Sequence, residues 1–169
     1  MRFRRSVLAL AAFVLLPGCR SEPPLDVAPV DLGRFQGKWY EIAKLPRTTE
    51  SGCSGTTAFY RLRSSTELDV TNECRLETGG TKSVTARAVA TDPSSPGKLS
   101  LDVGGFYGDY WVLGVGEHYE WAVIGHPSRD YLWILSRTPT LSDETLRATR
   151  SLAQDRSFDT SRLEYTAQP

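Results

Sequence analysis

The sequence predicts an all-β fold, an eight-stranded antiparallel up-and-down β-barrel with one C-terminal α-helix packed outside it. From residue 32 onward, short stretches rich in β-branched and aromatic residues alternate with clusters of Gly, Pro, Ser and Asp, as sequential strands alternate with turns. The connections are short, which favours neighbouring antiparallel strands, and closing the sheet removes its exposed edges. After residue 141 the apolar spacing becomes that of a helix.

The expected strands follow one another without an internal repeat. They cover residues 38–45, 55–63, 67–74, 81–90, 98–103, 109–115, 119–126 and 131–137. Turn-forming residues separate them, as in Thr78-Gly79-Gly80 and in the segment 92–97, which contains two prolines and a glycine. These residues favour tight reversals of the chain.

A helix is expected to begin at Ser142. This serine is a good N-cap residue, and Asp143 and Glu144 follow it where the helix dipole favours negative charge. Four residues then form a narrow apolar stripe: Leu146, Thr149, Leu152 and Ala153. A single apolar stripe is enough to dock the helix on the barrel wall.

The N-terminus resembles the signal sequence of a bacterial lipoprotein. Three arginines among the first five residues precede the unbroken apolar stretch 7–16, which is too short for a permanent membrane span. Leu16-Pro17-Gly18-Cys19 resembles a lipobox, in which the cysteine becomes the first residue of the mature chain and carries lipid. We therefore expect a signal peptide at 1–18 and lipidation at Cys19. An ordinary secretory signal is the alternative.

The residues that follow are expected to form a tether. Arg20 is not the aspartate associated with inner-membrane retention, so outer-membrane sorting, with the domain on the periplasmic side, is favoured. Three prolines lie in residues 20–31, and an extended chain of this length reaches about 37 Å. The lipidated cysteine and the Pro-rich tether thus cover 19–31, and the folded domain covers 32–169.

Cys53 and Cys74 are expected to form a disulfide. With Cys19 assigned to the lipid, these two remain as a pair in an oxidising compartment. In a hairpin turning at 64–66, Cys74 falls opposite position 55 or 56, close to Cys53 once a bulge is allowed. Two free thiols or a metal pair are the alternatives. No histidine has ligand spacing to either cysteine, so no metal is expected.

Length and composition agree with a compact exported protein. Removing the signal peptide leaves 17 basic and 20 acidic side chains, a net charge of about −3 with neutral histidines. Such a balance gives no reason to expect a nucleic-acid partner. No cofactor is expected.

Three segments stand out in the sequence: GKWYEIAKL at 37–45, HYEWAVIGHP at 118–127 and YLWILSRTPTLSDETL at 131–146. They resemble the short conserved regions of the lipocalins, and the last is most similar to the outer-membrane lipoprotein lipocalins of bacteria. The resemblance implies a calyx that binds a small hydrophobic ligand. It also implies structural roles for Gly37, Trp39 and Arg137, with the arginine packed across the indole at the closed end.

Strand alternation predicts which side chains face the interior. On the second to fourth strands the inward set is Ala58, Tyr60, Leu62, Leu68, Val70, Val84, Ala86 and Ala88. On the last three strands both faces are apolar, and matching to the lipocalin motifs suggests Tyr110, Val112, Gly114, Ala122, Ile124, Tyr131, Trp133 and Leu135. Small residues among them leave room for a ligand. The predicted ligand-binding residues are Ala58, Tyr60, Val84, Ala86, Tyr110, Val112, Ala122, Ile124, Tyr131 and Trp133.

The first strand carries an acidic residue on its inward face. The alternation that places Trp39 and Ala43 inside also places Glu41 there. A buried carboxylate needs a partner, hydration or protonation, and Arg137 is a candidate partner.

The open end of the barrel is expected to carry polar and aromatic loop residues. Phe106 and Tyr107 would form an apolar lip. Four basic residues would be available to an anionic head group: Arg47, Arg75, Lys82 and Arg129.

The sequence therefore predicts binding, with transport or storage, of fatty acids or lysophospholipids by a lipid-anchored envelope protein that is not an enzyme. Two other classes stay open, a lipid-directed enzyme with His126 beside a Ser or Cys nucleophile, and a structural envelope protein with a filled barrel. The motif G-x-S-x-G is absent. Haem binding through His126 is a further alternative, and the sequence leaves open whether the protein forms a homodimer.

Overall fold

The structure is a computed structural model, which describes residues 23–46 and 52–169. The predictions for the signal peptide, Cys19 and Arg47 lie outside these residues. The strands are β1 (Gly37–Lys44), β2 (Cys53–Ser64), β3 (Glu67–Leu76), β4 (Thr81–Ala90), β5 (Lys98–Val103), β6 (Phe106–Val115), β7 (Trp121–Gly125), β8 (Leu132–Ser136) and β9 (Glu164–Tyr165). The helices are α1 (Leu32–Phe35), α2 (Asp143–Asp155) and the 3-10 turn η2 (Thr160–Arg162).

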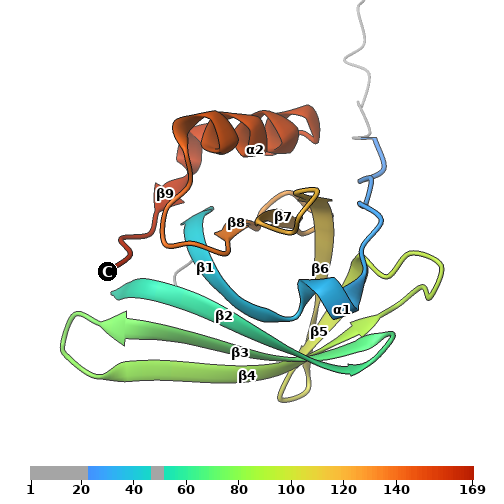
Figure 1. The fold of residues 1–169 in the computed structure, drawn as a ribbon, viewed down its shortest axis with the longest axis horizontal. Helices are drawn as coiled ribbons and strands as arrows, with labels where there is room; N and C mark the ends of the chain where they lie inside the picture. The colour runs from blue at the N-terminus through green and yellow to red at the C-terminus, as the bar shows by residue number, and fades with distance from the viewer. Residues whose placement is uncertain (1–22, 47–51) are drawn as a thin grey trace, which may run out of the picture.

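The predicted barrel is confirmed (Figure 1). Within the described chain, β1 to β8 form an antiparallel sheet in sequence order, and β1 pairs with both β8 and β2 to close it. The eight expected strands are all present, although β6 begins at Phe106 and β7 at Trp121. The elements α1 and β9 were not expected from the sequence.

The C-terminal segment completes the barrel wall where β1 and β2 separate. The two strands pair only from Gly37 to Tyr40 on β1, and beyond that point β9 pairs with Ala43 and Lys44. The Gln168 side chain donates to the carbonyls of Glu41 and Thr56, so residues on both strands are joined through it.

The two ends of the barrel differ. Because consecutive strands are antiparallel, the connections β1–β2, β3–β4, β5–β6 and β7–β8 all lie at one end, which we call the mouth. The other three connections and α1 lie at the opposite, closed end. No helix in the described part of the chain has the length and apolar character needed to cross a membrane.

An arginine and an indole seal the closed end. Trp39 is fully buried, its Nε1 donates to the Phe35 carbonyl at 2.8 Å, and the Arg137 guanidinium lies 3.9 Å from its ring centroid. Arg137 also donates to five backbone carbonyls: those of Arg34, Phe35, Gln36, Lys38 and Tyr119. Gly37 has φ of 100°, and a Cβ there would lie 3.2 Å from Arg137 Nη1. A side chain at this position would therefore be strained and would press on the arginine.

The helix α2 covers the outer face of the barrel, as expected (Figure 1). The Ser142 side chain accepts from the Thr145 N–H at 3.2 Å, which confirms the predicted N-cap. Ala153 is fully buried in a cluster with Leu113 and Val123, whose side chains point outward from β6 and β7.

Residues 23–31, the described part of the segment expected to form a tether, are packed against the barrel. Leu25 and Val30 are each only 6% exposed. The Ala28 N–H donates to the Val112 carbonyl at 2.9 Å, and the Asp31 N–H donates to the Tyr119 hydroxyl at 2.8 Å. We call residues 23–31 the N-terminal strap.

Two β-bulges shift the predicted inward pattern. The register of β1 shifts between Glu41 and Ala43, so Ala43 packs outside the barrel and Lys44 lies opposite Trp133. The register of β6 shifts between Val112 and Gly114, so Gly114 faces α2, where a Cβ would lie 2.6 Å from Leu152 Cδ1. The inward placements of Ala43 and Gly114 were therefore wrong, because an extra residue reverses alternation beyond it.

At the closed end, Leu62 was also expected to be inside. It is 36% exposed, because the barrel ends near this position of β2.

The predicted disulfide is present. Cys53 and Cys74 are bonded, with Cα atoms 5.4 Å apart. Their hairpin contains a register shift between Ser54 and Thr57, which brings the two cysteines together at the mouth.

Removing this disulfide should destabilise the protein. The double variant C53A/C74A frees a chain segment with a sequence separation of 21 residues. The unfolded state gains entropy, so the free energy of unfolding should fall by about 3 kcal/mol. Urea unfolding measures the loss. Wild-type protein under reductant is the matched control, and unchanged midpoints in both samples would contradict the expectation.

Arg137 should be the side chain on which closed-end stability depends most strongly. Arg137→Ala removes charge-assisted hydrogen bonds and the contact with Trp39, with an expected loss on the order of 3 kcal/mol. Arg137→Lys keeps the positive charge but lacks the planar guanidinium and its fixed set of N–H donors. It should therefore recover only part of the lost stability. Equal denaturant midpoints for the arginine and alanine proteins would refute this role.

Candidate functional site

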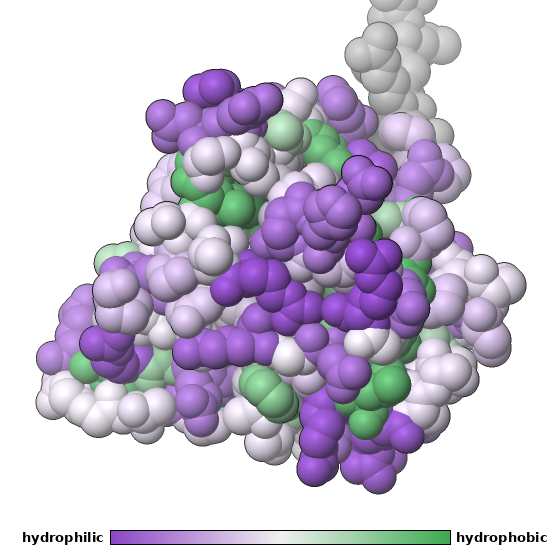
Figure 2. All heavy atoms as spheres, in the orientation of Figure 1, coloured by the Kyte–Doolittle hydropathy of each residue, from purple (hydrophilic) through white to green (hydrophobic). Residues whose placement is uncertain are grey.

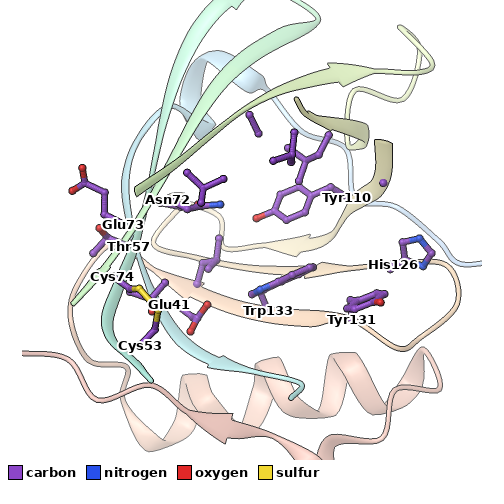
Figure 3. Close-up of a pocket in the computed structure, with 18 of the residues that line it drawn as sticks. Glu41, Cys53, Thr57, Asn72, Glu73, Cys74, Tyr110, His126, Tyr131 and Trp133 are labelled. Carbon is purple, nitrogen blue, oxygen red and sulfur yellow. A yellow bond between two sulfur atoms is a disulfide. The ribbon is translucent and has the colours of Figure 1, made fainter. Parts of the chain in front are cut away.

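A cavity of about 580 Å³ occupies the mouth half of the barrel (Figure 3). This volume lies in the range of sites that hold small ligands. Most of its wall is apolar and is contributed by strands around the barrel. Its deeper wall is formed by Ala58, Val84, Ala86, Leu101, Tyr110, Trp133 and Leu135.

Aromatic side chains form the floor of the cavity. Tyr110 and Trp133 point into it in Figure 3, with ring centroids 5.4 Å apart. The Tyr110 hydroxyl lies 2.6 Å from that of Tyr60, which is buried beneath it and packs edge-on against Phe35 at 5.0 Å. Burial raises the pKa of the Tyr60 phenol above its ordinary value, an effect that the hydrogen bond to Tyr110 opposes. Tyr60 is therefore neutral at physiological pH.

The ten residues predicted to bind ligand separate into two groups. Six lie on the cavity wall: Ala58, Val84, Ala86, Tyr110, Tyr131 and Trp133. The other four lie in the packed core nearer the closed end: Tyr60, Val112, Ala122 and Ile124. Strand alternation predicts which side chains face the barrel interior. It does not predict how far along the barrel the packed core ends and the cavity begins.

A buried ion pair lies at the cavity wall and was missed by the sequence analysis. Glu41 is 4% exposed, and Lys44 Nζ lies 3.5 Å from its carboxylate. The Thr166 hydroxyl also donates to Glu41. Arg137, the partner suggested by sequence, instead directs its donors to the closed-end carbonyls. Lys44 could not be recognised because the β1 bulge turns it inward.

The mouth carries exposed aromatic side chains. Phe106 is 82% exposed and Tyr107 is 75% exposed, and both lie on the cavity wall at the start of β6. On the face shown in Figure 2, by contrast, apolar residues form separate patches among hydrophilic ones. Phe106 and Tyr107 therefore form an apolar rim at the entrance of the cavity.

Of the basic residues expected near a head group, Lys82 lies on the cavity wall. Arg75 lies beside Gly55 on the neighbouring strand. Arg129 directs donors to the carbonyls of Pro23 and Arg156, away from the cavity.

His126 lies at the mouth in a local turn. Its Nδ1 accepts from the Ser128 N–H at 3.0 Å and lies 2.8 Å from the Ser128 hydroxyl. This is the geometry of a turn in which a side chain caps the backbone two residues on. Among residues 23–46 and 52–169, no cluster of three or more His, Cys, Asp or Glu side chains could hold a metal ion.

Comparison with known proteins agrees with this architecture. Residues 30–168 match the family model of the lipocalin-like domain. The outer membrane lipoprotein Blc of Vibrio cholerae is 37% identical over 170 residues, covering 97% of this chain and 99% of the relative. The outer membrane lipoprotein Blc of Escherichia coli K12 is 37% identical over 177 residues, covering 100% and 99%.

A solved structure shows the same fold. Insecticyanin from the tobacco hornworm Manduca sexta superimposes with a TM-score of 0.69 at 24% identity, covering 89% of this chain and 86% of that one. At this identity the likeness concerns the fold alone. The family match and the two bacterial relatives, both over nearly the full chain, place this protein in the lipocalin family.

Proposed function

We propose that this protein binds a single-chain lipid, a fatty acid or a lysophospholipid, in the cavity at the barrel mouth and carries or stores it in the bacterial envelope. The observation that carries the proposal is the half-hollow barrel. Its closed end is filled by the protein's own side chains, while its mouth half has about 580 Å³ of space bounded largely by apolar walls.

The cavity suits an acyl chain. The tail would lie against Ala58, Ala86 and Leu101 and stop at Tyr110 and Trp133. Each methylene removed from water contributes about 0.8 kcal/mol before the costs of association. The head group would remain at the mouth, near Lys82.

The N-terminus supports a membrane-anchored location. Both bacterial relatives are named outer membrane lipoproteins and align over nearly the whole chain. Together with the lipobox-like Leu16-Pro17-Gly18-Cys19, this supports a signal peptide at 1–18, a lipid on Cys19 and a location on the periplasmic side of the outer membrane. Because the strap is packed against the barrel, we propose that the folded domain begins before residue 32.

Binding needs no chemical step, and this distinguishes the proposal from an enzyme. Native mass spectrometry of protein extracted gently from cells should detect a co-purifying lipid that remains intact on incubation. Turnover of that lipid, lost in His126→Ala, would instead establish catalysis. A barrel that stays empty and refuses fluorescent fatty acids would favour the structural role.

Ala86→Trp should block the cavity. Ala86 lies on the wall, so an indole there would occupy ligand space and reduce the affinity for a fluorescent fatty acid about tenfold or more. Ala122→Trp is the contrasting variant, because Ala122 is fully buried in the core and overpacking there costs about 1–3 kcal/mol of stability. Fluorescence titration and urea unfolding are measured on both. Undiminished binding by A86W would rule out this cavity as the ligand site.

Lys82→Glu should weaken binding of anionic lipids. Reversing a charge on the cavity wall should reduce the affinity for a fatty acid about fivefold, while the affinity for its uncharged methyl ester should change little. Arg147→Glu, on the exposed face of α2, is the matched control for net charge. Equal losses for the acid and the ester, or in both variants, would argue against a head group beside Lys82.

A further inference from the structure

We propose that the barrel mouth faces the bilayer in which the lipid on Cys19 is embedded, with Phe106 and Tyr107 in contact with that bilayer. The proposal rests on the anchor at Cys19 that belongs to the proposed function, and it adds the orientation of the domain and its partner surface.

The N-terminal strap begins at the mouth. The Pro23 carbonyl accepts a hydrogen bond from Arg129 Nη2 at 2.6 Å, and Arg129 lies in the β7–β8 connection, which is one of the mouth connections. Leu25 is buried in the same cluster as Leu45 and Leu132. Leu45 directly follows β1 and Leu132 begins β8, both at the mouth, and the Leu45 N–H donates to the Leu132 carbonyl at 3.0 Å.

From this point the strap runs along the outside of the barrel to the closed end (Figure 1). The Ala28 N–H donates to Val112 on β6, and a Cβ at Gly97 would lie 2.6 Å from Val27 Cγ1. At the closed end the Asp31 N–H donates to the Tyr119 hydroxyl. The strap is thus held at its start, middle and end, and its direction is fixed.

The chain between the anchor and the strap is short. Cys19 precedes Pro23 by four residues, which span at most about 14 Å when fully extended. A ten-residue strand such as β4 spans about 33 Å along its own length. A tether this short, attached at the mouth, keeps the mouth near the bilayer surface and the closed end away from it.

The mouth has a surface suited to a bilayer. Phe106 and Tyr107 have the highest exposed fractions among the large hydrophobic side chains of the described residues, and Val103 beside them is 37% exposed. All three come from the β5–β6 hairpin, whose tip is Gly104-Gly105. Aromatic side chains favour the interfacial region of a membrane, where the ring is removed from water and polar atoms stay hydrated.

The same three side chains also line the cavity. A lipid could therefore pass between the bilayer and the barrel along a continuous apolar path without exposing its tail to water. Contact of the hairpin with the bilayer would thus serve exchange of the ligand as well as orientation.

The experiment uses the full lipidated chain in vesicles of phosphatidylethanolamine and phosphatidylglycerol with brominated acyl chains, which quench nearby tryptophan fluorescence. Phe106→Trp places a reporter on the hairpin. Ser65→Trp is the matched reporter, since Ser65 is exposed in the β2–β3 turn at the closed end. The fluorescence of the native tryptophans is measured on the unsubstituted chain and subtracted. We then expect the fluorescence of the F106W reporter to be quenched about twofold or more and that of the S65W reporter to be unaffected. Quenching of S65W equal to or above that of F106W would overturn the orientation.

Flotation of the protein with the vesicles tests the lipid anchor on Cys19 separately from the orientation of the barrel. A chain that carries no lipid, or that floats no better than Cys19→Ser, would overturn the anchor and the orientation with it. A lipidated chain that floats while F106W remains unquenched would overturn the orientation alone. Inserting about 20 Gly and Ser residues after Cys19 adds a flexible span of about 25 Å. Flotation should persist while quenching of F106W falls by about half or more, and unchanged quenching would refute the role of the short tether.

Discussion

The contact of the Arg137 guanidinium with Trp39 determines how the interior of this barrel is divided. Arg137 covers the outer face of the indole and binds backbone carbonyls from the chain before β1 and from the β6–β7 connection. These contacts hold the closed end together while Phe35 and Trp39 fill it with apolar volume. Because the closed end is sealed and packed, the cavity can exist only in the mouth half of the barrel. Access to the cavity is therefore from the mouth.

The mouth half is stabilised by additional means, because its interior is hollow. The disulfide joins β2 to β3, and the C-terminal residues fill the gap where β1 and β2 separate. Glu41 and Lys44 form their buried pair in this region, with Thr166 as a further partner. A buried pair of this kind rarely adds much stability compared with apolar residues, but it is costly to break. Through Thr166, the C-terminal segment is joined to this buried pair at the cavity wall.

The fold could be predicted from the sequence because the signals for it are local. Short strands, turn residues and the Ser142 cap each depend on a few neighbours, and the hairpin register that pairs Cys53 with Cys74 needs only one turn to be located. The inward face of β1 and β6 could not be predicted in full, since the bulges near Ile42 and Leu113 arise from pairing with β8 and β7. The bulges are the reason why the inward position of Lys44 was not predicted. They are also the reason why Ala43 and Gly114 were wrongly predicted to face the interior.

The depth of the cavity depends on packing across the barrel, which no single strand specifies. Tyr60 on β2 and Tyr110 on β6 come from opposite sides of the barrel, and the contact of their hydroxyls places two aromatic side chains across its interior. Val112, Ala122 and Ile124 are fully buried in the core and contribute to stability, whereas Ala58 and Ala86 line the cavity and bound its empty space. For the proposed lipid ligand, the length of acyl chain that fits would therefore be limited by Tyr110 and Trp133 and not by Trp39, which closes the barrel.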